Sequence, residues 1–383
     1  MDKDVEELLS RGVEKIYPST EELKAVLLSG KKLKLYQGFD PTGDKLHIGH
    51  LVGLRKLSDW QKLGHHVIFL IGDFTGIIGD PSGKTEARKM LSKEVVLENA
   101  KKYKEQAGKI LNFGGENPVE IKYNSEWLGK MSGLEFIQAA ASLSVQQVIK
   151  RDLFQERAKS GQDLYMNEFL YPVMQAYDSV AMDVDLEVGG TDQMFNMLMG
   201  RKLARHVLEK EKFVMTTPLL TDSNGKKIGK TEGNAIALTD EPGELFGKVM
   251  SLPDEVITKC FECLTRIPME KVLEIENAIQ NGENPMIYKK ELAFQIVSDL
   301  NSEQDAQEAK KSFEEAFSKG GIPKDIKTVE ASSDKSLADI FLEEGIVSSK
   351  TEFNRLDKEG AIKEIENGVY RVGKHRFLKI NFI

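Results

Sequence analysis

The sequence predicts an α/β protein: a first domain with a parallel sheet covered by helices, then a helical segment, then a small α+β module. From Leu33 onward, short apolar runs alternate with amphipathic stretches of helical period. Between about residues 241 and 319 the period is helical throughout, and the remaining C-terminal stretch reads as two helices followed by closing strands. A chain of 383 residues exceeds what one hydrophobic core usually serves, so more than one domain is expected.

We expect three domains, at residues 1–225, 226–320 and 331–383. The boundary between the first two falls at "GKKIGKTEGN", a glycine- and lysine-rich segment typical of a surface loop. The stretch "IPKDIKTVEASSDKS" is polar and irregular, and we interpret it as a linker before the last module.

The first domain opens with a strand, helix and strand. The segment "KLKLYQGFD" predicts a strand ending near Gly38, and "HVIFLIGD" predicts a buried strand ending near Asp73. Between them, "HIGHLVGLRKLSDWQKLG" has helical period and closes on Gly64, a typical C-cap. A later unit repeats the pattern, with a strand through Val188, a Gly-Gly turn and a long helix. Ligands bind outside the carboxyl ends of such strands, so a site is expected beside Gly38 and Asp73.

Composition limits the function classes. No run of about 18 apolar residues occurs, so no membrane span is expected. The start "MDKDVEELLSRG" lacks the apolar block and cleavage site of a signal peptide, which favours a cytoplasmic protein. The net charge of −8 means that any nucleic acid has to be bound by local basic patches.

Two short motifs suggest chemistry that their surroundings do not support. Cys260 and Cys263 form "CFEC", but no second CxxC or histidine cluster exists, so we interpret them as buried thiols on a helix and expect no metal site. The stretch "GIIGDPSGKT" resembles a phosphate loop, yet Gly79 and Gly83 enclose three residues where four are needed, and Ile78 stands where the glycine should be.

The motif "HIGH" places His47 and His50 three residues apart at the predicted helix start, on one face. Two ordinary helix histidines would give the same pattern. Neutral imidazoles can also donate to phosphate oxygens, where a helix N-terminus adds N–H groups and partial positive charge. Gly49 would let a nucleobase lie against the backbone, and Thr42 offers a hydroxyl to the same phosphates.

A second motif, "KKIGKT", carries Lys227 and Lys230 on a glycine-bearing loop. Such lysines are either solvated surface or a loop that closes over a polyphosphate and neutralises departing pyrophosphate. An HxGH motif followed by a loop of this kind resembles the paired signature of the class I aminoacyl-tRNA synthetases. The general form of the loop is KMSKS; here both lysines are kept, while glycine and threonine replace the two serines.

The resemblance extends to the bacterial tyrosyl-tRNA synthetase family. The matching blocks are "YQGFDPTGDKLHIGHLV", "GDFTGIIGDPSGKTEAR", "YPVMQAYDSV", "VGGTDQMFN" and "KIGKTEGN", in the family's order. The tail "SLADIFLEEGIVSSKTEFNRLDKEGAI" with "YRVGKHRFLKI" resembles an S4-type RNA-binding module. The resemblance implies a Rossmann-like, doubly wound catalytic domain, a helical domain on the anticodon side, and an S4-like C-terminal domain.

The resemblance also implies a tyrosine site. Tyr36 and Asp178 match the positions that hydrogen-bond the substrate phenol, and Asp80, Tyr171 and Gln175 match those that hold its ammonium. Tyr171, Gln175 and Asp178 fall at i, i+4 and i+7, which places them on one face of a helix. Polar contacts to a hydroxyl let a site reject phenylalanine, a property for which this enzyme family is itself the usual example.

For ATP, the resemblance implies contacts along both signatures and the two strand ends. Asp192 follows the Gly-Gly turn at a predicted helix start, where it can reach ribose hydroxyls. The implied ATP-binding set is Gly38, Asp40, His47, Gly49, His50, Gly190, Asp192, Gln193, Lys230 and Thr231.

The implied reaction has two steps. The tyrosine carboxylate attacks the α-phosphorus of ATP, giving tyrosyl-adenylate and pyrophosphate, and a ribose hydroxyl of tRNA then takes the tyrosyl group. Catalysis therefore needs positioning and charge stabilisation, with Mg²⁺ arriving on ATP, and no protein nucleophile. The implied catalytic residues are Thr42, His47, His50, Lys84, Arg88, Lys227 and Lys230.

The tail is a candidate tRNA surface, and a homodimer is implied by resemblance only. Arg371, Lys374, Arg376 and Lys379 lie within nine residues that contain no acid. Three alternatives stay open: a tryptophanyl-tRNA synthetase, a nucleotidylyltransferase with another acceptor, and an RNA-binding protein on a synthetase scaffold without activity. The pair Tyr36 and Asp178 argues against a tryptophan enzyme, because an indole pocket would not need it. The lysine loop and the RNA-type tail argue against the nucleotidylyltransferase, and the intact pocket residues argue against a protein without activity.

Overall fold

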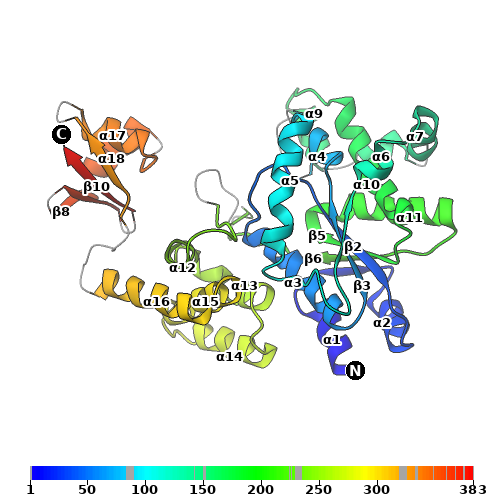
Figure 1. Ribbon diagram of the computed structural model, residues 1–383, viewed down its shortest axis with the longest axis horizontal. Coiled ribbons are helices and arrows are strands. Elements are labelled where there is room, and N and C mark those ends of the chain that lie inside the picture. The colour runs from blue at the N-terminus through cyan, green and yellow to red at the C-terminus, as the bar shows by residue number, and fades with distance from the viewer. Residues whose placement is uncertain are drawn as a thin grey trace.

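The computed structural model describes most of the chain (Figure 1). The described residues are 2–82, 90–141, 143–149, 152–223, 225, 227–228, 235–318, 326–332, 335–347, 349–358, 360–366, 368–373 and 376–382.

The first domain is built on a six-stranded sheet with the strand order β1-β6-β5-β2-β3-β4. All neighbours pair in parallel except β1, which runs antiparallel to β6. The strand order reverses between β2 and β5, so their carboxyl ends face a crevice of the kind that binds ligands in open sheets. The strands are β1 Lys15–Tyr17, β2 Lys34–Phe39, β3 His66–Ile71, β4 Glu120–Tyr123, β5 Leu186–Gly190 and β6 Phe213–Thr217.

Helices cover this sheet, as Figure 1 shows. They are α1 Asp2–Ser10, α2 Thr20–Leu28, α3 Ile48–Lys62, α4 Thr75–Ile78, α5 Lys93–Ala107, α6 Ser125–Leu128, α7 Gly133–Ala140, α8 Val145–Ile149, α9 Asp152–Lys159, α10 Met166–Ala181 and α11 Met194–Leu208.

Alternation along β2 decides which side chains reach each face of the sheet. Leu35 and Phe39 are buried in the main core with residues of α3. Tyr36 points the other way and packs with Ile68 and Met182 in a separate buried cluster. One strand thus holds the α3 layer on one side and presents Tyr36 on the other.

The predicted strand, helix and strand unit is confirmed, and Gly64 follows the α3 C-cap with a φ of +77°. The predicted Gly-Gly turn is wrong. Gly189 and Gly190 belong to β5, where they pair with Thr216 and Thr217 of β6. The turn comes later, as a 3-10 helix at Thr191–Gln193.

A helical part follows, and Figure 1 shows it between the sheet domain and the C-terminal module. Its helices are α12 Pro242–Met250, α13 Ile257–Leu264, α14 Met269–Gln280, α15 Pro285–Leu300 and α16 Glu303–Ser318, with a 3-10 turn at Asp254–Val256. The prediction of continuous helical period here is confirmed. Cys260 and Cys263 are buried on α13, and burial raises the pKa of both thiols, that of Cys263 to about 12. Such thiols stay protonated near neutral pH.

The C-terminal module is a four-stranded sheet of order β7-β10-β9-β8 with two helices. Part of the predicted linker is a strand: β7 pairs in parallel with β10, so the module begins before residue 331. The prediction missed β7 because its sequence, "TVEA", is short and half polar. The elements are β7 Thr328–Ala331, α17 Leu337–Glu343, α18 Lys350–Lys358, β8 Ile362–Glu366, β9 Val369–Val372 and β10 Arg376–Phe382.

Among the described residues, no helix is long and apolar enough to cross a membrane.

Candidate active site

A pocket of about 730 Å³ opens at the carboxyl ends of β2 and β5. The sequence placed the site at this edge, and the pocket gathers residues that are up to about 190 positions apart in the chain, from Tyr36 to Ile228. The predicted site residues that line it are Tyr36, Gly38, Asp40, Thr42, His47, Gly49, His50, Asp80, Tyr171, Gln175, Asp178, Gly190, Asp192, Gln193 and Lys227.

Asp178 is the buried acceptor at one end of the pocket. Its Oδ1 accepts from Trp127 Nε1 at 2.7 Å, and its Oδ2 accepts from Asn124 Nδ2 at 3.3 Å. Burial raises the pKa of Asp178 well above its ordinary value, and these two donors oppose the rise because both favour the carboxylate. Tyr36 also lines the pocket, and its hydroxyl lies 2.9 Å from Ser179 Oγ.

A second group of acceptors lines the same pocket. The Tyr171 hydroxyl donates to Asp40 Oδ2 at 2.8 Å, and Asp80 accepts from Gln193 Nε2. Gln175 donates from Nε2 to Glu187 at 3.1 Å, while its Oε1 is buried and has no hydrogen-bond partner among the described residues. Since Nε2 is committed to a carboxylate, the free amide oxygen is an acceptor, which suits a cationic group.

The two histidines of "HIGH" form the N-terminus of α3. His47 is the N-cap: its Nδ1 accepts from Gly49 N at 3.1 Å, and His50 Nδ1 accepts from His47 N at 3.1 Å. Their rings stack with centroids 3.9 Å apart. Because Nδ1 is an acceptor in each neutral ring, the proton sits on Nε2, which becomes the donor.

Gly49 has a local reason that the sequence did not reveal. A Cβ at this position would lie 2.9 Å from the His47 ring, closer than real Cβ contacts allow. Glycine is therefore needed for the His47 cap itself, besides the space that it leaves in the pocket.

The flanks of the second motif join the first. Ile48 N donates to Ile236 O at 3.0 Å and Leu238 N donates to Leu46 O at 2.9 Å, so the chain leaving the lysine loop is anchored to the start of α3. Lys227 Nζ lies 2.6 Å from Asp192 Oδ2 at the pocket wall. One lysine of the loop thus meets the carboxylate predicted to hold the ribose.

Five predicted site residues lie outside the described residues: Lys84, Arg88, Lys230, Thr231 and Lys374. Within the described part of the chain, no group of three or more His, Cys, Asp or Glu side chains could hold a metal ion.

Sequence reasoning missed four residues that line the pocket or hydrogen-bond to its lining: Asn124, Trp127, Ser179 and Glu187. The first two follow β4, whose carboxyl end lies at the same edge, so recognising "EIKY" as a strand would have pointed to them. Glu187 carried a weaker signal, as a carboxylate inside the otherwise apolar strand "LEVGG".

Residues 28–318 match the model of the family described as tRNA synthetases class I (W and Y). That description covers tryptophan and tyrosine enzymes alike and defines the class.

Relatives that match nearly the whole chain distinguish the tyrosine enzymes from the tryptophan enzymes. The tyrosine–tRNA ligase of Thermotoga maritima is 42% identical over 390 residues, covering 98% of this chain and 96% of the relative. That of Idiomarina loihiensis is 40% identical, covering 97% and 96%. The chain belongs to this class I family, and within it to the tyrosine–tRNA ligases. The alternatives of a tryptophan enzyme and of a protein without catalytic activity are therefore set aside.

Solved structures show the same fold at lower identity. A truncated mitochondrial tyrosyl-tRNA synthetase of Aspergillus nidulans aligns with a TM-score of 0.67 at 23% identity, over 82% of this chain and 94% of that one. The tyrosyl-tRNA synthetase of Archaeoglobus fulgidus, solved in complex with L-tyrosine, aligns with a TM-score of 0.63 at 22% identity, over 81% and 100%.

Proposed function

We propose that this pocket activates L-tyrosine with ATP and that the chain then transfers the tyrosyl group to the 3′ end of tRNA(Tyr). The observation that carries the proposal is a cavity that Tyr36 and Asp178 line together with the acceptors Asp80 and Gln175. The start of α3, with the "HIGH" motif, lines the same cavity. The test is charging of total tRNA with labelled amino acids. Tyrosine should be esterified and tryptophan should not; charging by tryptophan would refute the specificity.

For the amino acid, the phenol lies between Tyr36 and Asp178, and the ammonium lies against Asp80, Tyr171 and Gln175. A carboxylate suits the phenolic proton, and the free Gln175 oxygen with the Asp80 carboxylate suits a cation. An indole would place a ring N–H, and no oxygen, at the Tyr36 end.

For ATP, the phosphates lie at the N-terminus of α3. The Nε2–H groups of His47 and His50 donate to phosphate oxygens, together with the Thr42 hydroxyl, and the partial positive charge of the α3 N-terminus favours the phosphates there. Lys227 exchanges Asp192 for phosphate as charge develops, and Asp192 then binds ribose. Lys84, Arg88 and Lys230 take part from outside the described residues, and Mg²⁺ enters as part of the ATP complex.

The nucleoside lies along the strand ends. Gly38 and Gly190 line the pocket there. A Cβ on Gly190 would lie 2.6 Å from Asp192 Oδ1, so glycine at this position leaves room for the Asp192 carboxylate. Asp40 and Gln193 line the same region, although both are tied to the amino-acid group, through Tyr171 and Asp80 respectively. Gly49 completes this set, with Thr231 outside the described residues.

We also propose a cytoplasmic homodimer joined through the segment around α7, α8 and the start of α10. Exposed apolar side chains gather there: Leu134 is 67% exposed, Ile137 65%, Val145 64% and Met166 71%. Such side chains on neighbouring helices are typical of a surface that a second copy covers.

Ile137→Asp should shift the protein from dimer to monomer in sedimentation at micromolar concentration, because the interface would have to bury a carboxylate. Leu273→Asp, which changes a 53% exposed side chain on α14, is the control and should leave the dimer intact. A monomeric wild type, or a dimeric Ile137→Asp, would contradict the proposed interface.

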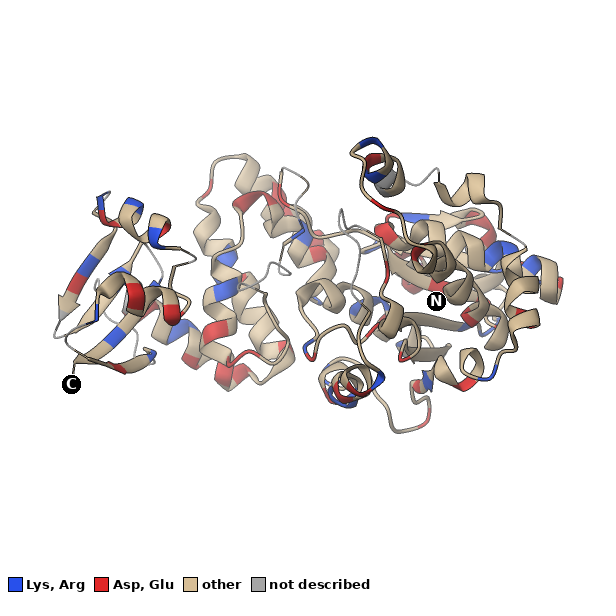
Figure 2. Cartoon of the chain, turned by 90° about the horizontal axis from the view of Figure 1, so that it is seen from above, with Lys and Arg blue, Asp and Glu red and all other residues tan. Residues whose placement is uncertain are grey.

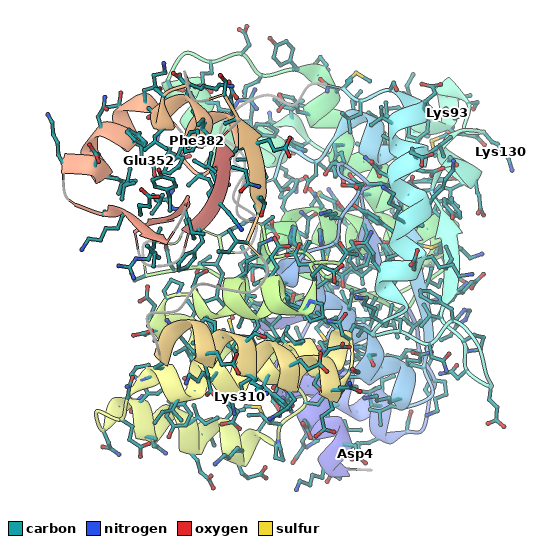
Figure 3. All side chains as sticks on the ribbon, turned by 60° about the vertical axis from the view of Figure 1, so that its left-hand side comes forward. Asp4, Lys93, Lys130, Lys310, Glu352 and Phe382 are labelled. Atoms are coloured by element: carbon teal, nitrogen blue, oxygen red, sulfur yellow. The ribbon has the colours of Figure 1, made fainter. Side chains whose placement is uncertain are left out.

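The tRNA is proposed to contact the open face of the C-terminal sheet. Lys363, Arg371 and Phe377 are cross-strand neighbours on β8, β9 and β10, and Lys379 lies two residues further along β10. Arg376 points to the helix side instead, where it donates to Ile346 O and pairs with Glu352 at 3.2 Å. Figure 2 shows basic residues along these strands, and Figure 3 labels Glu352. We therefore propose Arg371 and Lys379 as contacts and Arg376 as a residue that stabilises the module.

Lys379→Glu should raise the KM for tRNA roughly three- to tenfold, because one phosphate contact becomes repulsive, and should leave adenylate formation unchanged. The matched control is Lys3→Glu on α1, where the side chain is 87% exposed. Steady-state charging against tRNA concentration measures the effect. Equal KM values for the two variants would remove this face from the tRNA interface.

A further inference from the structure

A buried ion pair lies directly behind the tyrosine pocket. Lys212, which immediately precedes β6, is fully buried, and its partner Glu187 on β5 is 2% exposed. Glu187 reaches the pocket wall, whereas Lys212 does not. Removing two charges from water is costly, and apolar residues of similar volume often stabilise a fold as well. Packing alone therefore does not explain why this ion pair is buried, and its contacts indicate a further role.

The pair connects to Tyr36 through one serine. Lys212 Nζ donates to Ser179 Oγ at 2.7 Å, and Ser179 Oγ lies 2.9 Å from Tyr36 Oη. Lys212 Nζ also lies 5.8 Å from the centroid of the Tyr36 ring. A Cβ on Gly200 of α11 would come within 2.7 Å of Lys212 Nζ and 2.8 Å of Ser179 Oγ. The fold thus keeps a glycine where this cluster needs the space.

The chemistry of the donors sets a direction along this chain. An ammonium group can only donate, so Ser179 Oγ accepts from Lys212. The Ser179 proton then goes to Tyr36 Oη at 2.9 Å or to Glu187 Oε2 at 3.3 Å. Glu187 Oε2 already accepts from Lys212, and the Tyr36 hydroxyl interacts with Glu187 as well as with Ser179. Burial beside that carboxylate raises the pKa of Tyr36 well above its ordinary value, so Tyr36 keeps its proton and can donate it. The shorter contact therefore takes the Ser179 proton, and the hydroxyl proton of Tyr36 is directed elsewhere, into the pocket that its side chain lines.

We propose that Lys212 and Ser179 are positioning residues that make Tyr36 a hydrogen-bond donor to the phenol oxygen of the substrate, and so contribute to the choice of tyrosine over phenylalanine. The inference rests on the proposed placement of the phenol between Tyr36 and Asp178. The complete chain runs from Lys212 through Ser179, Tyr36 and the substrate hydroxyl to Asp178, and every hydroxyl accepts one bond and donates one. Phenylalanine would interrupt it and leave two buried polar groups unpaired.

Glu187 orients a second side chain, at the ammonium end of the substrate. Its Oε1 accepts from Gln175 Nε2, which leaves the Gln175 oxygen as the acceptor for the ammonium. One buried pair therefore orients a donor for the phenol and an acceptor for the amine.

Ser179→Ala tests the proposal, because it breaks the link and leaves the Lys212 and Glu187 pair in place. In tyrosine-dependent exchange of pyrophosphate into ATP, kcat/KM for tyrosine should fall about tenfold, while kcat/KM for phenylalanine and the KM for ATP stay unchanged. Ser58→Ala removes a hydroxyl from another buried serine, on α3, and is the control. An equal loss for both amino acids would reduce Ser179 to a packing role and overturn the proposal.

A double-mutant cycle with Tyr36→Phe tests the coupling between the two hydroxyls. Ser179→Ala should cost little once Tyr36 has lost its hydroxyl, and additive losses would contradict the relay. Because Lys212→Met alone leaves Glu187 unpaired and risks misfolding, Lys212→Met is combined with Glu187→Gln. That double variant should show the same selective loss of tyrosine use, and retention of the full tyrosine preference would overturn the role of Lys212.

Asp178→Asn distinguishes a failure of the hydrogen-bond chain through Lys212, Ser179 and Tyr36 from a failure of the proposed position of the phenol. If this variant keeps the wild-type ratio of tyrosine to phenylalanine use, the placement of the phenol is wrong. If it loses the ratio while Ser179→Ala keeps it, the placement stands and the relay alone is refuted.

Discussion

Asp178→Asn is expected to lower kcat/KM for tyrosine in adenylate formation by about a hundredfold or more, about 3 kcal/mol, with the KM for ATP nearly unchanged. The carboxylate accepts from Trp127 and Asn124 and, in the proposed site, from the substrate phenol. An amide has one oxygen, so its NH₂ group would face one of these donors and the substrate would lose its acceptor.

Pyrophosphate exchange with tyrosine and ATP varied separately measures this effect. The matched control is Asp183→Asn, which changes the partner of Lys210 at the exposed end of α10 and should have no effect. Equal losses in the tyrosine and ATP dependence would show that Asp178 supports the whole pocket and does not read the phenol.

His50→Ala is expected to slow adenylate formation about a hundredfold, about 3 kcal/mol of transition-state stabilisation, while tyrosine binding stays near wild type. The Nε2–H of His50 is oriented by the bond from His47 N to its Nδ1, so the donor is held ready for charge that grows on phosphate. The same substitution removes that local bond and should cost about 1 kcal/mol of folding stability.

Single-turnover kinetics and thermal unfolding together separate the two effects of His50→Ala. His66→Ala, which removes an exposed histidine paired with Glu120 at the start of β3, is the control and should keep the wild-type rate. If His50→Ala kept the rate and lost only stability, the motif would be a helix cap without a catalytic role.

The sequence predicted the parts of the site that follow local patterns. Strand β2, the start of α3 and the face of α10 that carries Tyr171, Gln175 and Asp178 all depend on period and spacing, and the pocket brings them together. The pairing of His47 and His50 follows from their positions at i and i+3, although the capping bonds that set their tautomers were visible only in the structure.

The parts that escaped prediction depend on contacts between distant segments. Lys212 meets Glu187 because β5 and β6 are neighbours, and neither residue belongs to a motif. Asn124 and Trp127 reach Asp178 from the end of β4, on the far side of the sheet order from β5. Strand β7 is defined by its partner β10 and has little apolar pattern of its own. The roles of these residues and of β7 follow only once the order of the strands in each sheet is known.

The central claim is that this pocket selects tyrosine by its hydroxyl and activates it with ATP. The most direct measurement is exchange of labelled pyrophosphate into ATP by the wild-type protein with tyrosine, phenylalanine or tryptophan in turn. Strong exchange with tyrosine, and far weaker exchange with the other two at equal concentration, is the predicted result. Exchange with tryptophan but not tyrosine, or equal exchange with tyrosine and phenylalanine, would contradict it.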